Sequence, residues 1–115
     1  MDEQARIELM QGYFEGMDEA DADRLRSVFA EDAVYDHLER TARGIDDIVT
    51  LLIDERTPQD TVHEVNRWVH DAEVSIAEGV KTGTVEGEPT ELPFCDVFEF
   101  DADDSAIVHL GVYAR

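Results

Sequence analysis

Asp96 is the residue of this chain whose surroundings most clearly suggest chemistry. It lies in the run 94–100 (FCDVFEF), where the side chains of an extended strand alternate between two faces. Its own face carries three aromatic neighbours, Phe94, Phe98 and Phe100. A carboxylate there is unfavourable unless it is paired, hydrogen-bonded or protonated. We therefore expect Asp96 either to anchor the sheet or to act as a protonated acid, with Phe94 and Phe98 lining a pocket.

Two histidines have the side chain needed for a general base, since an unperturbed imidazole has a pKa of about 6.5. His37 shares a strand face with Tyr35, whereas Asp36 lies on the opposite face. His63 shares the face of a later strand with Val65, Arg67 and Val69. Each histidine has an alternative role as a satisfied core residue. We name His37 as the catalytic candidate and His63 as a pocket residue.

Two large aromatic side chains each have more than one interpretation. Tyr35 is either part of the pocket wall or simply packed, and Trp68 is a pocket residue, a packing residue or part of a dimer face. We list both as pocket-lining residues.

The chain offers no recognisable set of metal ligands. Cys95 is the only cysteine, which excludes an intrachain disulfide and is typical of a reducing compartment. The four histidines have no zinc-type spacing with Cys95 or with one another. We expect neither a metal nor a cofactor.

The elements that must position these residues divide into helices and then strands. Apolar residues recur with helical spacing over residues 3–17, with Tyr13 at the edge of the apolar face. A second helix should follow the capping candidates Asp21 and Asp23. A third should run from Ile45 to Arg56, with Pro58 just beyond its end.

The remainder of the chain reads as strands. We expect them at residues 62–69, 72–85, 91–100 and 106–113, after a short strand at 33–37. Helices first and hairpins afterwards predict an α+β fold, with three N-terminal helices packed on one antiparallel sheet. We expect residues 1–115 to form a single domain.

Composition describes the environment more than the activity. The net charge is −20, and the acidic residues are spread along the whole chain, which favours a halophilic protein whose surrounding salt screens its self-repulsion. Such a charge argues against nucleic-acid binding. The chain has no apolar run of about 20 residues and an acidic N-terminus without a signal-peptide pattern, so we expect a cytoplasmic protein that does not bind membranes.

Several of these segments together resemble the nuclear transport factor 2-like superfamily, in particular its SnoaL-like branch. They are the first helix with Tyr13-Phe14, the turn Phe29-Ala30-Glu31-Asp32-Ala33, the helix start Gly44-Ile45-Asp46-Asp47-Ile48, the run Asp96-Val97-Phe98-Glu99-Phe100, and the last strand with Ile107 and Tyr113. The resemblance covers the whole chain. It implies a strongly curved, cone-shaped sheet around the helices, with an apolar cavity and frequent dimerisation. One fold hosts many functions, so it implies less about activity.

Ketosteroid isomerase, a member of that superfamily, allows a comparison by position. Its oxyanion-hole tyrosine falls at Tyr13 and its protonated oxyanion-hole aspartic acid at Asp96. Its catalytic aspartate falls at His37, and the local carboxylate, Asp36, is one residue away and therefore on the opposite strand face. The resemblance thus implies a kept oxyanion pair and a changed base.

Two functions follow from this reading. The first is an isomerase- or cyclase-type enzyme acting on an apolar carbonyl compound, with His37 as base and with Tyr13 and Asp96 stabilising the enolate. The second is a non-catalytic module that binds a small apolar ligand or dimerises. In both we expect a homodimer, with Trp68 as an interface candidate.

Overall fold

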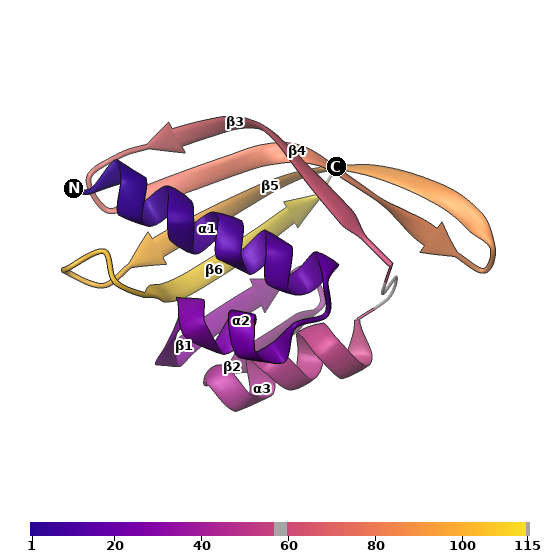
Figure 1. Cartoon of the computed structure of the whole chain (residues 1–115), viewed down its shortest axis with the longest axis horizontal. Helices are drawn as coiled ribbons and strands as arrows, with labels where there is room; N and C mark the ends of the chain where they lie inside the picture. The colour runs from indigo at the N-terminus through magenta and orange to yellow at the C-terminus, as the bar shows by residue number, and fades with distance from the viewer. Residues whose placement is uncertain (57–59, 115) are drawn as a thin grey trace.

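Three helices lie on one side of a curled six-stranded sheet (Figure 1). The computed structural model describes residues 1–56 and 60–114. The elements in chain order are α1 (Glu3–Asp18), α2 (Ala22–Val28), β1 (Phe29–His37), β2 (Arg40–Arg43), α3 (Ile45–Thr50), the π-helical turn η1 (Leu51–Glu55), β3 (Val62–His70), β4 (Val74–Val85), β5 (Glu88–Phe100) and β6 (Ile107–Ala114). This arrangement confirms the predicted α+β class.

The first two helices begin at acidic caps. The Asp2 side chain accepts a hydrogen bond from the Ala5 backbone amide at 3.0 Å, and Asp21 accepts one from Arg24 at the same distance. Such caps satisfy amides that have no partner within the helix. Phe29 is extended, with φ −96° and ψ 144°, so α2 ends at Val28 and passes directly into β1.

The third predicted helix has the expected extent but two geometries. Its α-helical part ends at Thr50, and Leu51–Glu55 continue as a π-helix. Apolar spacing alone does not distinguish these two windings over a single turn. Pro58 lies outside the described residues.

The sheet is mixed, which corrects the prediction of a purely antiparallel one. Its strand order is β2-β1-β6-β5-β4-β3, and β1 pairs with β6 in parallel while every other pair is antiparallel. The side-chain alternation of a strand is the same in either direction, so it could not reveal this pairing. The four-residue strand β2, mostly exposed, was not predicted because it carries no apolar alternation.

Irregular pairing bends the sheet around α1. The register shifts between Phe29 and Val34 in β1 and between Val65 and Arg67 in β3. Gly79 of β4 lies beside the second irregularity, where a Cβ atom would overlap the backbone carbonyl of Glu64. Bulges of this kind strengthen the local twist and curve a sheet.

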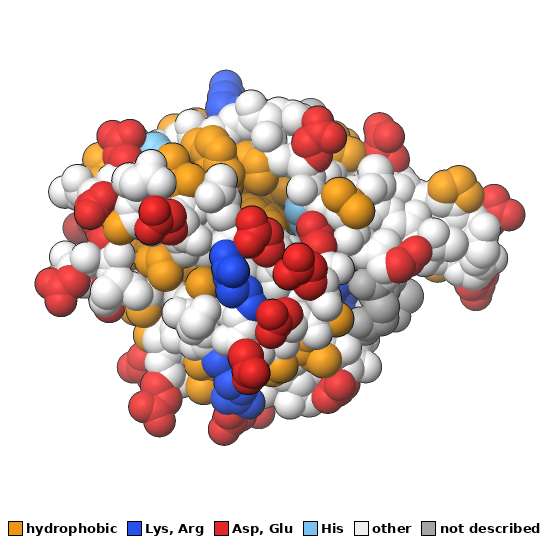
Figure 2. Space-filling view, viewed as in Figure 1, with side chains coloured by type: hydrophobic (Ala, Val, Ile, Leu, Met, Phe, Trp, Pro, Cys, Tyr) orange, Lys and Arg blue, Asp and Glu red, His pale blue; other side chains and the backbone are white. Residues whose placement is uncertain are grey.

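Acidic side chains are scattered across the face seen in Figure 2, with few basic ones among them. No helix within residues 1–56 and 60–114 is long and apolar enough to cross a membrane.

The buried side chain of Arg6 joins three parts of the fold. Its Nε donates to Asp104 Oδ1 at 2.9 Å in the loop before β6. Its two terminal nitrogens donate to the carbonyls of Asp71 and Ala72, both at 2.8 Å, in the turn before β4. The guanidinium also lies 4.8 Å from the ring centre of Phe100. The start of α1 is thereby fixed to both loops at one end of the sheet.

Replacing Arg6 should therefore be strongly destabilising. Arg6→Ala leaves the Asp104 carboxylate buried without its cation, and we expect a loss of about 3 kcal/mol in the free energy of unfolding, measured by urea denaturation. The control is Arg67→Ala, which removes an exposed pair with Glu78 and should cost less than about 1 kcal/mol. Equal losses in the two variants would contradict this role for Arg6.

Candidate functional site

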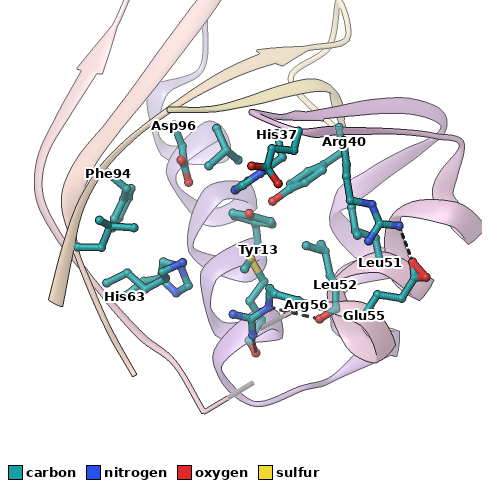
Figure 3. A pocket seen from close by; sticks show the side chains of 16 residues that line it. Tyr13, His37, Arg40, Leu51, Leu52, Glu55, Arg56, His63, Phe94 and Asp96 are labelled. Atoms are coloured by element: carbon teal, nitrogen blue, oxygen red, sulfur yellow. Dashed lines mark hydrogen bonds and ion pairs between the residues drawn. The ribbon is translucent and has the colours of Figure 1, made fainter. Parts of the chain in front are cut away.

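A cavity of about 280 Å³ opens between α1, the π-helical turn and the concave face of the sheet. Its apolar wall comes from Met17, Leu51, Leu52, Leu92, Phe94 and Val112. Its polar wall comes from Tyr13, Tyr35, His37, Glu39, Arg40, Glu55, Arg56, His63, Lys81 and Asp96. Figure 3 shows that Tyr13, His37 and Asp96 reach this one cavity from α1, β1 and β5.

Asp96 is held in the protonated state by its burial. The residue is only 3% exposed, and within the described part of the chain its Oδ1 has no hydrogen-bond partner. Desolvation raises the pKa of this carboxyl to about 8, although the positive charge of Lys81 acts in the opposite direction. At neutral pH Asp96 can therefore donate a hydrogen bond into the cavity.

Two buried tyrosines, Tyr13 and Tyr35, line the cavity together with Asp96. The hydroxyls of Tyr13 and Tyr35 are hydrogen-bonded to each other, and both side chains are buried. Burial raises the pKa of Tyr35 to about 12 and the pKa of Tyr13 well above its usual value. Both groups stay protonated at neutral pH. Because their mutual bond uses only one of the two protons, the other hydroxyl keeps a proton to donate.

His37 lines the cavity at its exposed rim. Partial burial lowers the pKa of the imidazole, and the nearby charge of Lys81 lowers it further, while Glu39 acts in the opposite direction. The ring is therefore mainly neutral at pH 7 and able to accept a proton. Asp36, the alternative base, is not among the lining residues; its carboxylate binds Thr41 at 2.7 Å and His109 at 2.8 Å.

His63 has a partner that the sequence did not reveal. Its Nδ1 lies 2.6 Å from Asp18 Oδ1, and its backbone amide donates to Asp18 Oδ2 at 2.8 Å. A carboxylate at this nitrogen favours the tautomer with the proton on Nδ1, which leaves Nε2 as an acceptor. The available signal was Asp18 itself, since a carboxylate in the last turn of a helix opposes the helix dipole and needs another partner.

Basic side chains at the cavity were also missed. Arg40 pairs with Glu55 at 2.8 Å, and Arg56 donates to the carbonyls of Leu52 and Met17 at 3.3 and 3.1 Å. Lys81 is half-buried, and desolvation together with the charge of Arg56 lowers its pKa. The signal for Lys81 was its place in the inward-facing alternation of β4.

The remaining predicted pocket residues divide into two groups. Tyr35, His63 and Phe94 line the cavity. Phe98 and Trp68 are not among the lining residues: Phe98 is fully buried against Tyr13, and Trp68 packs half-buried beside Phe14. Alternation assigned Phe98 to the correct face of β5, but it could not show that α1 covers that part of the strand.

Comparisons with known proteins agree with this architecture. The family model of the SnoaL-like domain matches residues 10–110. A putative SnoaL-like polyketide cyclase from Jannaschia sp. CCS1 has a TM-score of 0.83 at 11% identity, covering 96% of this chain and 85% of that one. An LEH-like epoxide hydrolase of Mycobacterium tuberculosis has a TM-score of 0.80 at 19% identity, covering 97% and 84%.

A further similar structure is a protein with a ketosteroid isomerase-like fold from Catenulispora acidiphila, in complex with trimethylamine. Its TM-score is 0.80 at 17% identity, with coverage of 92% of this chain and 84% of that one. No curated protein matches the chain by sequence. At these identities the structures support the fold and leave the chemistry to be argued from the cavity.

The raised pKa of Asp96 predicts a pH-dependent stability. An unfolded aspartic acid loses its proton near pH 4, whereas the folded carboxyl retains it until about pH 8. Over this interval the folded state holds the Asp96 proton and the unfolded state does not, so the contribution of Asp96 to stability falls as the pH rises. Asp96→Asn removes that loss. The unfolding free energy of Asp96→Asn minus that of the parent protein should increase from pH 4 to pH 8 by the order of a few kcal/mol, and should stay constant above pH 8.

Denaturant titrations of both proteins across this pH range provide the measurement. The matched control is Asp32→Asn, because Asp32 is exposed and its carboxyl is solvated in both states. Its stability difference from the parent should not change in this way. A flat difference for Asp96→Asn would show that the folded carboxyl is already ionised at neutral pH.

Proposed function

The chain belongs to the SnoaL-like domain family, and we propose that it binds a small apolar carbonyl compound in its cavity and catalyses proton transfer beside the carbonyl. The observation that carries this proposal is Asp96, a buried acid whose Oδ1 has no partner among the described residues. A group of this kind is poised to donate to an oxygen that becomes negative during a reaction. The apolar walls suit the rest of such a substrate.

The proposed reaction begins when the base removes a proton from the carbon next to the carbonyl. The C–H electron pair forms a carbon–carbon double bond, and the carbonyl π electrons move to oxygen. Asp96 and the free hydroxyl of the Tyr13–Tyr35 pair stabilise the resulting enolate by hydrogen bonds. In a β,γ-unsaturated ketone the negative charge extends to the γ carbon, and return of the proton from the base to that carbon gives an isomerisation. In a compound with a second carbonyl, the enolate carbon attacks that carbonyl carbon, its π electrons move to oxygen, and this oxygen takes the proton back from the base, which gives a cyclisation.

We assign the role of base to His37. Its neutral imidazole lies on the cavity side of β1, and Asp36 is engaged elsewhere. His63 is the competing candidate, because Asp18 orients its ring. Substitution of each histidine in turn distinguishes them.

A non-catalytic binding module is the second candidate function. It is favoured by one observation: His37 is at the exposed rim, whereas Asp96 is buried deeper. The same cavity and donors would then hold a carbonyl ligand without removing a proton. Binding without proton exchange is its distinguishing result.

We also propose that the protein forms a homodimer. The edge strand β3 exposes Val62 and Val69, which are 61% and 40% exposed. Trp68, from the same strand, remains the interface candidate. A second copy that covers this region would bury apolar surface that the helices leave uncovered.

Deuterium exchange tests the catalytic proposal. We expect the protein to accelerate exchange of the α-protons of enolisable apolar ketones in D₂O, followed by NMR. Asp96→Ala should reduce this rate by about 100-fold or more because it removes an oxyanion donor. His37→Gln should reduce it similarly if His37 is the base, and His63→Gln should then have a smaller effect.

The control for this experiment is Asp32→Asn, which lies outside the cavity and should exchange at the parent rate. Full activity in Asp96→Ala would rule out the mechanism. Ketone binding without exchange by the parent protein would favour the binding module.

The halophilic character is proposed from the charge. With a net charge of −20 the folded chain repels itself, and at molar salt the Debye length falls to about 3 Å. We expect the melting temperature to rise by several degrees or more between low salt and about 2 M KCl. Sucrose serves as a control because it stabilises proteins without screening charge. A melting temperature that does not change with KCl would remove the halophilic assignment.

A further inference from the structure

We propose that Lys81 makes this cavity a binding site for small apolar molecules that carry one carboxylate. Lys81 is the only lysine of the chain and lies in the cavity wall. The inference deepens the proposed function by naming the ligand class of the same cavity. It concerns binding alone, so it can be tested without turnover.

The first argument is the position of the side chain. Along β4, the inward-facing residues Ser75, Ala77 and Gly79 are buried, and Lys81 continues this alternation two residues further. Its half-buried ammonium makes no hydrogen bond or ion pair with any residue within 1–56 and 60–114. A partly desolvated cation without a partner is unfavourable, and an incoming anion would relieve that cost.

The second argument is the contrast with the other cations of the chain. With 29 acidic and 9 basic residues, carboxylate partners are abundant. Five arginines each pair with one: Arg6, Arg24, Arg26, Arg40 and Arg67. Against this background Lys81 is distinctive, because it is a half-buried cation in a cavity wall without a carboxylate partner among the described residues.

The third argument is the state of the acid nearby. Asp96 is close enough to Lys81 for a charge on its carboxylate to raise the pKa of the lysine. Burial, however, keeps the Asp96 carboxyl protonated and therefore uncharged at neutral pH. It therefore does not neutralise the ammonium. A ligand carboxylate can therefore pair with Lys81 without competition from Asp96, whose proton stays available for the carbonyl oxygen of the same ligand, while the charge of Arg56 adds to the favourable field.

The other residues that line the cavity indicate the polarity, size and charge of the remainder of the ligand. Leu92, Phe94 and Val112 provide apolar surface beside the two polar groups. A volume of about 280 Å³ lies near the lower end for ligand cavities, so the molecule should be small. Glu39 and Glu55 at the same cavity disfavour a second negative charge. These features together select an apolar monocarboxylate.

Calorimetric titration of the full-length chain with two matched probes tests this proposal. The probes are naphthalene-2-carboxylate and its neutral amide, naphthalene-2-carboxamide, measured in the same buffer and salt. We expect the carboxylate to bind about tenfold more tightly or better, because the ammonium recognises its charge. Neither probe has an α-proton that could be enolised, so the result is independent of the exchange experiment.

Three variants complete the test. Lys81→Met keeps an unbranched side chain of nearly the same length but removes its charge, and should weaken carboxylate binding about tenfold while leaving amide binding unchanged. Lys81→Arg should retain the preference, which separates loss of charge from misfolding. Arg67→Met, on the exposed pair with Glu78, removes the same charge outside the cavity and should bind like the parent.

Three results would overturn the proposal: equal affinity of the parent for acid and amide, no binding of either, or undiminished carboxylate binding by Lys81→Met. Carboxylate binding with no α-proton exchange in any ketone would support this inference while refuting catalysis.

Discussion

Helix α1 is held across the concave sheet by polar contacts at each end, buried at its start and partly buried at its end, and the cavity depends on this constraint. At its start, the Arg6 guanidinium binds Asp104 and the carbonyls of the turn before β4. At its end, Asp18 accepts hydrogen bonds from His63 and Thr61 of the β3 region. Fixing both ends sets the rotation of the helix, and that rotation directs Tyr13 toward the face that carries Asp96.

The chemistry of the cavity arises from unequal desolvation of its groups. Asp96 is deeply buried and keeps its proton to about pH 8, whereas His37, at the rim, has its pKa lowered and stays neutral. A donor and an acceptor can therefore coexist at the same pH within one small space. The paired hydroxyls of Tyr13 and Tyr35 add a second donor without adding charge.

Local pattern explains which parts of this structure could be predicted. Helical spacing and strand alternation were sufficient for α1, for the inward face of β5 and hence for Asp96. The parallel pairing of β1 with β6 depends on contacts between distant segments, which alternation does not encode. For the same reason the sequence could not predict the Asp18–His63 pair or the packing of α1 over Phe98. Each of these contacts joins a residue of α1 to a residue more than forty positions further along the chain. Lys81 was visible only as a lysine in an inward-facing position.

The cationic side chain of Lys81 in the cavity wall, set within so acidic a protein surface, has a kinetic consequence for a negatively charged ligand. At low salt the charge of −20 repels such a ligand at long range and slows its approach. At molar salt that repulsion is screened over about 3 Å, while a contact with the half-buried Lys81 is screened much less. Association should then accelerate with salt while dissociation changes little. In a salt-rich cell, the dissolved ions would thus determine how fast the cavity fills, and the lysine how long it stays occupied.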